Sequence, residues 1–252
     1  MAPLDVSLRY DHIWAPAREA INATAFVDDE GVRAADAPPV VVAAEAWSAR
    51  SGKLLHSQQW SVPLASQVVT EVGKLSFVPS DADVGDTVIL ILEARGQNCS
   101  YPRCVGRGCY HSARDPHSNA TCLLSSHSYT FGIALKGATT SDELSAPLSM
   151  LRNVNSSCVV ADVHDRGSPG TSEIVVHNTS PNIAVMARVI PHDLSGMTSG
   201  DALPWTALTD NYFSLRPDEH KTVRLRQLGK VGEVSGVGVA SWNAAAGGEQ
   251  CY

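Results

Sequence analysis

The chain has 252 residues, of which 44% are hydrophobic and 18% are charged. This balance excludes general disorder, and the length suits one large domain or two domains of ordinary size. The formal net charge of −7 argues against nucleic acid and anionic membrane as partners. The longest dense apolar run, Val88–Leu92, is far shorter than the ~20 residues of a membrane helix. We therefore expect a globular protein without a membrane-spanning segment.

Short apolar stretches separated by turn residues recur along the first half of the chain. Many alternate or are rich in β-branched residues, which is typical of strands; Val40, Val42 and Ala44, for example, share one face. Segments such as Arg50–Gly52 supply turn residues between them. The expected strands are Leu4–Arg9, Ala20–Val27, Pro39–Trp47, Lys53–Val62, Val68–Val78, Thr87–Glu93 and Ser128–Leu135.

The strand pattern lapses between Gly137 and Ser149, where Ser141 can cap a single helical turn whose length Pro147 limits. We interpret residues 139–150 as a linker. The strand pattern then resumes, and the expected strands are Ser157–Val163, Glu173–His177, Ile183–Ile190, Tyr212–Leu215, Thr222–Leu225 and Val234–Trp242.

These patterns predict an all-β fold with two immunoglobulin-like β-sandwiches in tandem. The first covers residues 1–138 and carries a Cys-rich insertion at about 96–127. The second covers residues 151–252. Neither half has the Cys–Trp–Cys spacing of antibody domains, so the pattern predicts the architecture alone.

Five of the nine asparagines lie in Asn-x-Ser/Thr sequons, where chance would place about one. These candidate glycosylation sites are Asn22, Asn98, Asn119, Asn155 and Asn178. They favour a protein that is secreted or resides in a lysosomal or vacuolar lumen, whereas Met1–Asp5 shows no signal peptide. We therefore expect the C-terminal part of a longer secreted protein, or a gene model whose start is missing. A cytosolic protein with chance sequons is the alternative.

The six cysteines also favour a secreted, lysosomal or vacuolar location. Cys99, Cys104, Cys109 and Cys122 are spaced C-x4-C-x4-C-x12-C, and cross-links would order such a loop. Disulfides are the leading interpretation; zinc and free thiols are the alternatives, and the x4 spacings match no common zinc finger. Three disulfide pairings of the four remain open. Cys158 and Cys251 can join the first and last strands of the second half or remain separate thiols.

No catalytic, metal or cofactor signature is present. We interpret Asp28–Glu30 as a solvated, charged turn. Asp162, His164 and Asp165 can be drawn as a triad with Ser168, but a turn explains them better. The tryptophans can form a sugar-stacking platform, or most of them can serve as core or inter-domain anchors. They are Trp14, Trp47, Trp60, Trp205 and Trp242.

The segment Leu203–Leu225 resembles the C-terminal β-sandwich of glycoside hydrolase family 2, especially its exo-β-D-glucosaminidase and endo-β-mannosidase branch. That pattern has Leu-Pro, then Ser-Asp-Asn-Tyr-Phe, then Leu-x-Pro-Gly-Glu; Asp218 stands where Gly is usual. The end Ser241–Asn243, with Trp242, resembles the Gly-Trp-Asn that often closes such domains. Residues 1–138 show a weaker likeness to the preceding sandwich. The matching residues are Leu203, Pro204, Asp210, Asn211, Tyr212, Phe213, Leu215, Pro217 and Glu219.

The resemblance implies a partner rather than an active site in this chain. Members of the family are retaining hydrolases with two catalytic glutamates on a (β/α)8 barrel upstream of these sandwiches. A barrel takes ~250 residues of alternating strand and helix, a pattern that this sequence lacks. No catalytic residue is carried over. Asp210 and Asn211 are expected to bond neighbouring backbone, and Tyr212 and Phe213 to point to opposite faces.

The leading hypothesis is a non-catalytic accessory segment of a family 2 glycosidase that acts on β-linked glucosamine or mannose. Its expected partner is the upstream barrel, with glycans as a further possibility, and the chain alone is expected to be inactive and free of cofactors. The alternatives are a free-standing carbohydrate-binding or adhesion module that uses an exposed Trp/Tyr face, and a purely structural cell-surface protein.

Overall fold

The computed structural model describes residues 4–29, 38–63, 68–80, 83–96, 122–137, 140, 142–143, 154–165, 171–193, 206–227 and 234–244. The chain divides into two compact units, Met1–Asn155 and Ser156–Tyr252, called here the N-terminal and C-terminal units. The elements of the described residues are β-strands, so the predicted all-β class is confirmed. None of these residues forms a helix long and apolar enough to cross a membrane. The immunoglobulin-like assignment stays a prediction.

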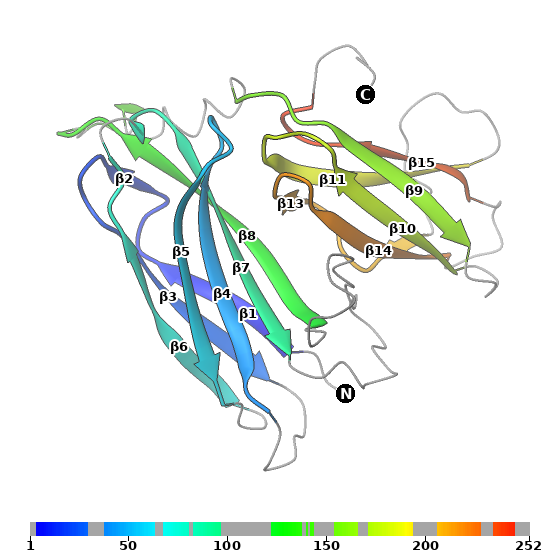
Figure 1. The fold of residues 1–252 in the computed structure, drawn as a ribbon, viewed down its shortest axis with the longest axis horizontal. Helices are drawn as coiled ribbons and strands as arrows, with labels where there is room; N and C mark the ends of the chain where they lie inside the picture. The colour runs from blue at the N-terminus through cyan, green and yellow to red at the C-terminus, as the bar shows by residue number, and fades with distance from the viewer. Residues whose placement is uncertain are drawn as a thin grey trace. The chain divides into compact units, whose positions relative to one another are not determined.

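The N-terminal unit is built from two sheets that enclose one core (Figure 1). One sheet has the strand order β1-β3-β6 and the other has the order β2-β8-β7-β4-β5. All pairs are antiparallel except β2 with β8. The strands are β1 (Leu4–Tyr10), β2 (Trp14–Pro16), β3 (Ile21–Asp29), β4 (Val40–Ser48), β5 (Leu54–Val62), β6 (Val68–Phe77), β7 (Thr87–Gly96) and β8 (Cys122–Ala134).

The core of the N-terminal unit follows the two-residue period of its strands. On β4, Val42, Ala44 and Ala46 face inward, and on β7 the inward positions include Leu90 and Leu92. These side chains are almost completely buried. Burying a Leu or Val contributes about 1.5–3 kcal/mol, so the alternation read in the sequence is the main source of stability here.

One buried carboxylate fixes the turn between β4 and β5. Asp86 accepts hydrogen bonds from the backbone N–H of Arg50 (3.1 Å) and Thr87 (2.7 Å) and from the Ser48 hydroxyl. Gly52 closes the turn with φ 67°, a left-handed conformation that favours glycine. The turn predicted at Arg50–Gly52 therefore forms, and a residue far along the chain stabilises it.

Side chains from β8 cover the free edge of β1. The Val6 N–H donates to the Ser125 hydroxyl (3.3 Å), and the Leu8 N–H donates to the Tyr129 hydroxyl (3.0 Å). Tyr10 packs edge-on against the Tyr129 ring, with centroids 5.9 Å apart. These contacts satisfy donors that an uncovered edge strand would offer to another chain.

The C-terminal unit also has two sheets around a separate core (Figure 1). Their strand orders are β12-β14-β10-β9 and β13-β11-β15. Ile174, Val176, Ala187, Leu215 and Val223 are among the fully buried core side chains. The strands are β9 (Val159–Asp165), β10 (Thr171–Asn178), β11 (Ala184–Asp193), β12 (Thr206–Leu208), β13 (Phe213–Leu215), β14 (His220–Gln227) and β15 (Val234–Ala240).

Thr140 and Glu143 bond to each other in the segment interpreted as a linker, whereas Ser141, the expected cap, lies outside the described residues. The Thr140 hydroxyl accepts from the Glu143 N–H (3.3 Å), and the Glu143 carboxylate accepts from the Thr140 N–H (3.2 Å). This reciprocal pair has the three-residue spacing of a capping box, with Thr140 as the cap.

We predict that Tyr129→Phe lowers the free energy of unfolding of the N-terminal unit by about 1 kcal/mol, because the Leu8 N–H loses its acceptor. Burial raises the pKa of Tyr129 above 10.0, although the Leu8 hydrogen bond opposes the shift. Stability linked to a raised pKa is present below the unfolded pKa and is lost as the pH rises through the folded pKa. The wild type should therefore lose stability above about pH 10 more steeply than the variant. Urea unfolding between neutral and alkaline pH measures this; equal slopes would contradict it.

Candidate functional site

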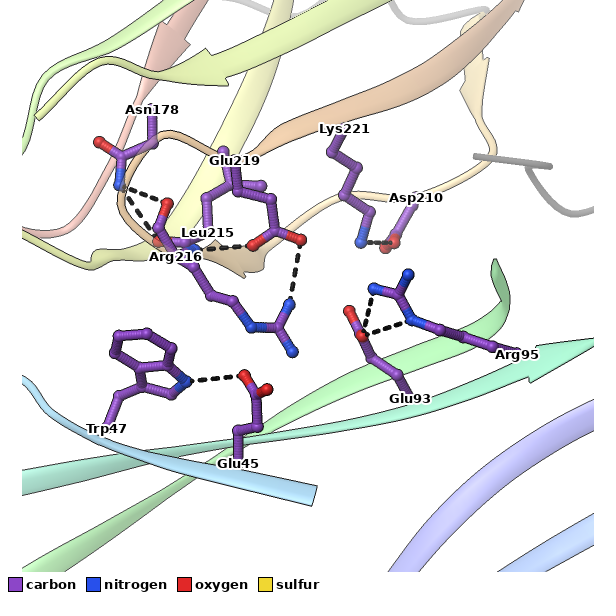
Figure 2. A network of polar contacts seen from close by, with 10 residues as sticks. All are labelled: Glu45, Trp47, Glu93, Arg95, Asn178, Asp210, Leu215, Arg216, Glu219 and Lys221. Atoms are coloured by element: carbon purple, nitrogen blue, oxygen red, sulfur yellow. Dashed lines mark hydrogen bonds and ion pairs between the residues drawn. The ribbon is translucent and has the colours of Figure 1, made fainter. Parts of the chain in front are cut away.

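The motif turn between β13 and β14 needs a left-handed residue at Asp218. The Glu219 N–H donates to the Arg216 carbonyl (3.2 Å), with Pro217 and Asp218 between them. Asp218 has φ 60°, and a turn with Pro in its second position and positive φ in its third is of type II. The Glu219 carboxylate accepts from the Arg216 N–H (2.7 Å) and pairs with its guanidinium (3.1 Å), as Figure 2 shows. Pro217 and Glu219 therefore have structural roles in this turn.

Asn178 joins this turn to the end of β10. Its amide nitrogen donates to the carbonyls of Asn182 (2.8 Å), Leu215 (3.2 Å) and Arg216 (3.0 Å). Its side-chain oxygen accepts from the N–H (3.2 Å) and hydroxyl (2.7 Å) of Ser180. Figure 2 shows the amide directed at the turn. Asn178 is fully buried, so its polar atoms are satisfied inside the protein.

This environment does not fit the glycan expected on Asn178. An N-linked glycan is attached to the same nitrogen, which here has no solvent exposure and is engaged by carbonyl groups. By contrast, the sequon residues Asn22 and Asn155 are exposed and stay predicted sites. Asn98 and Asn119 lie outside the described residues. In this conformation the Asn178 side chain has a structural role and is not accessible for attachment of a glycan.

Asp210 forms an ion pair, and the backbone contact expected from the sequence stays a prediction. Its carboxylate lies 2.5 Å from the Lys221 ammonium, which is itself buried (Figure 2). The same ammonium lies 4.3 Å from the centre of the Phe213 ring. A buried charge needs such compensation, because leaving it unpaired costs several kcal/mol. Lys221 was not predicted from the sequence, because the pairing of the strands decides which lysine lies beside Asp210.

Asn211 forms the backbone contact that the sequence predicts. Its side-chain oxygen accepts from the N–H of Val189 (2.9 Å) and of Tyr212 (3.1 Å), and its nitrogen donates to the Val189 carbonyl (3.4 Å). The amide thus bonds both polar groups of one β11 residue, as a neighbouring strand would. Tyr212 is exposed and Phe213 is buried, but Tyr212 has φ 61°. A left-handed residue, rather than strand alternation, separates the two rings.

At the closing motif, Asn243 has the structural role expected of Trp242. The Trp242 side chain is 55% exposed, whereas Asn243 is buried. The Asn243 oxygen accepts from the Val185 N–H (2.9 Å) and the Ser157 hydroxyl (3.0 Å), and its nitrogen donates to the Ile183 carbonyl (2.8 Å). Sequence reasoning quoted Asn243 within its motif and gave it no role, because burial of a polar residue beside a strand end is invisible in one sequence.

Three of the other tryptophans lie on different strands and contact different neighbours, and the sugar-stacking platform stays a prediction. Trp14 stacks on His12 with ring centroids 5.0 Å apart, and Trp47 donates to the Glu45 carboxylate (3.1 Å). Trp60 lies so close over Gly73 that a side chain at this glycine has no room. Trp205 lies outside the described residues.

Two carboxylates lie on one face of the five-stranded sheet, and both have protein partners (Figure 2). Glu93 accepts from Arg95 at 2.8 and 3.2 Å, and Glu45 accepts from the Trp47 indole. Each pair joins residues two apart on one strand, which share a face. These contacts make Glu93 and Glu45 structural carboxylates.

Most of the candidate cysteines fall beyond the described part of the chain, namely Cys99, Cys104, Cys109 and Cys251. Cys122 begins β8, and Cys158 is disulfide-bonded. The described residues contain no group of three or more His, Cys, Asp or Glu side chains placed to hold a metal ion. Asp162 and His164 of the possible triad are exposed on β9.

We predict opposite effects for two substitutions at Asp218. Asp218→Gly should leave the free energy of unfolding of the C-terminal unit unchanged or raise it by up to about 1 kcal/mol, because glycine adopts positive φ without strain. Asp218→Ala should lower it by about 1 kcal/mol or more, because alanine keeps the strain and has no polar side chain. Both variants lose the contact of Asp218 with His177 (3.3 Å). The loss of this contact therefore cancels when the two variants are compared with each other. Denaturant unfolding measures the difference, and equal stabilities would contradict the turn assignment.

Comparison with known proteins gives a likeness in structure alone. No protein-family model matches the chain significantly, and neither does any curated protein sequence. The solved structures that it resembles include the exo-chitosanase CsxA of Amycolatopsis orientalis at 16% identity, with a TM-score of 0.54. A complex of the E541A form of that enzyme with PNP-β-D-glucosamine gives 17% identity and a TM-score of 0.53. A structure of the exo-β-D-glucosaminidase CsxA with inhibitors gives 18% identity and a TM-score of 0.51.

The extent of the match is asymmetric. It covers 88% of this chain and 24% of the CsxA chain. This chain therefore spans about a quarter of the length of the enzyme that it resembles. At such low identity the likeness shows the fold alone: most of this chain has the fold of an all-β portion of a much longer exo-chitosanase.

Proposed function

We propose that this chain is a non-catalytic accessory segment of a larger family 2 glycoside hydrolase that acts on β-linked glucosamine or mannose glycans. The observation that carries the proposal is the match of 88% of this chain to only 24% of a chitosanase chain. The motif from Asp210 to Glu219 supports it, because its polar residues serve the fold rather than a reaction.

The proposed partner is a (β/α)8 barrel in the same polypeptide, which carries the two catalytic glutamates of a retaining hydrolase. The C-terminal unit supplies a rigid body for such a partner, because its turns are bonded to one another by Asn178. The exposed sequon residues Asn22 and Asn155 support a secreted, lysosomal or vacuolar location.

The test compares the isolated 252-residue chain with the complete polypeptide read from the full-length transcript. Both are assayed for release of glucosamine from chitosan oligosaccharides and of mannose from β-mannan oligosaccharides. We predict hydrolysis by the complete polypeptide and activity lower by a factor on the order of a thousand or more in the isolated chain.

Two results would contradict the proposal. The first is hydrolysis by the isolated chain at the rate of the complete polypeptide. The second is a transcript with an in-frame stop codon directly before Met1 and no barrel-coding sequence. Titration of the isolated chain with the same oligosaccharides distinguishes the alternative, a free-standing carbohydrate-binding module, which requires binding without any barrel.

A further inference from the structure

Three large apolar side chains are exposed on one sheet of the C-terminal unit. They are Met186 on β11, Tyr212 directly before β13 and Trp242 two residues after the end of β15, which are 39%, 61% and 55% exposed. We call them the aromatic patch. β11 lies between the other two strands in the sheet order β13-β11-β15. Three neighbouring strands therefore contribute to the patch.

Two hydrogen bonds place the three residues close to one another along β11. The Met186 N–H donates to the Ser214 hydroxyl (3.4 Å), two residues from Tyr212. The Trp242 N–H donates to the carbonyl of Val185 (2.8 Å), the residue before Met186. All three patch residues therefore lie near the same position of the central strand.

Two of the three patch residues are held in a strained backbone conformation. Met186 has φ 49° and lies in the bulge between Ala184 and Ala187, and Tyr212 has φ 61°. A left-handed conformation costs such residues about 1–2 kcal/mol, and it persists only where the surroundings fix it. Asn211 does so for Tyr212 by accepting its N–H (3.1 Å). The fold thus holds large apolar side chains outward at a cost to stability, which is typical of a binding surface.

The composition of this surface fits a protein partner. Arg188 lies two residues after Met186 and is also exposed, and it is paired across the sheet with Ala240. Met, Tyr, Trp and Arg are the residue types enriched in the cores of protein interfaces, and Trp, Tyr and Arg dominate their binding energy. The cationic Arg188 beside the patch disfavours a polycationic chitosan chain and favours a surface that carries a carboxylate.

We propose that the aromatic patch is the surface through which the C-terminal unit docks onto the catalytic domain of the same longer polypeptide. The inference rests on the proposed function. The asymmetry of the comparison argues for that occupant, because the match covers 88% of this chain and only 24% of the chitosanase chain that it resembles. Interfaces between domains of one chain bury about 600–1,500 Å², an area that several exposed large side chains on one sheet face can anchor.

Hydroxyl-radical footprinting with mass spectrometry tests the proposal, because Met, Trp and Tyr side chains react readily. We expect strong oxidation of the aromatic patch in the isolated chain. In the complete polypeptide we expect its oxidation to be lost, down to the level of buried Phe213. Val163 on β9, in the other sheet of the unit and 43% exposed, is the control whose reactivity should not change.

The outcomes separate this inference from the proposed function. If the complete polypeptide hydrolyses glycans and its patch is oxidised as fast as in the isolated chain, the docking surface is wrong and the proposed function stands. If no longer polypeptide exists, both fail. If the isolated chain gains protection on addition of chitosan or β-mannan oligosaccharides, the occupant is a glycan and the docking proposal is overturned.

A pair of substitutions gives a second readout that does not depend on oxidation. Trp242→Ser combined with Tyr212→Ser should leave the Tm of the isolated chain unchanged, because both side chains are exposed there. The same change should lower the Tm of the complete polypeptide by about 2 °C or more. Val163→Ser is the matched control and should leave both values unchanged. An equal Tm loss in the isolated chain and the complete polypeptide would overturn the proposal.

Discussion

Asparagine side chains in the C-terminal unit replace backbone hydrogen bonds that its strands leave unmade. Asn211 bonds both polar groups of Val189, and Asn243 bonds the N–H of Val185 and the carbonyl of Ile183. Asn178 ties the end of β10 to the motif turn. An amide has a donor and an acceptor in the geometry of a peptide group, so each asparagine can stand in for one residue of a missing strand. The two sheets and their turns depend on these bonds.

The same residues determine what the C-terminal unit presents to solvent. Asn211 holds the N–H of Tyr212, and buried Asn243 directly follows Trp242 in the chain. The polar atoms of the motif thereby fix the positions from which two aromatic rings extend. This links the motif to the proposed accessory role without any reacting group: its asparagines shape a surface, and the surface is what a partner domain would contact. Each buried amide left without a hydrogen-bond partner would lower the free energy of unfolding by about 1–3 kcal/mol. The hydrogen bonds of these asparagines therefore strongly favour the observed arrangement.

Most of the strands could be predicted from the sequence, because alternation and β-branched residues are local signals. Val88–Leu92 was expected to be a strand and forms the buried centre of β7. β2 and β12, of three residues each, were missed because they show no period, whereas the equally short β13 was expected within Tyr212–Leu215. β8 begins at Cys122, earlier than the predicted Ser128.

The candidate site could be predicted only in part. The resemblance identified Asn211 and the turn residues Pro217 and Glu219, but it did not give Lys221 as the partner of Asp210. It identified Trp242 as a structural residue of the closing motif, whereas Asn243 has that role in the structure. The difference arises because ion pairs and buried amides join residues distant in sequence, which one sequence without its fold does not reveal. The unusual residue at 218 is understood only from its positive φ.

The most direct test of this account is the hydrogen exchange of asparagine side-chain amides, followed by ¹⁵N NMR. The account predicts slow exchange for the NH₂ groups of Asn178 and Asn243, which are buried and bonded to carbonyls. It predicts fast exchange for exposed Asn22 and Asn155. Equally fast exchange at all four asparagines would show that these amides do not support the sheets, and it would contradict the account.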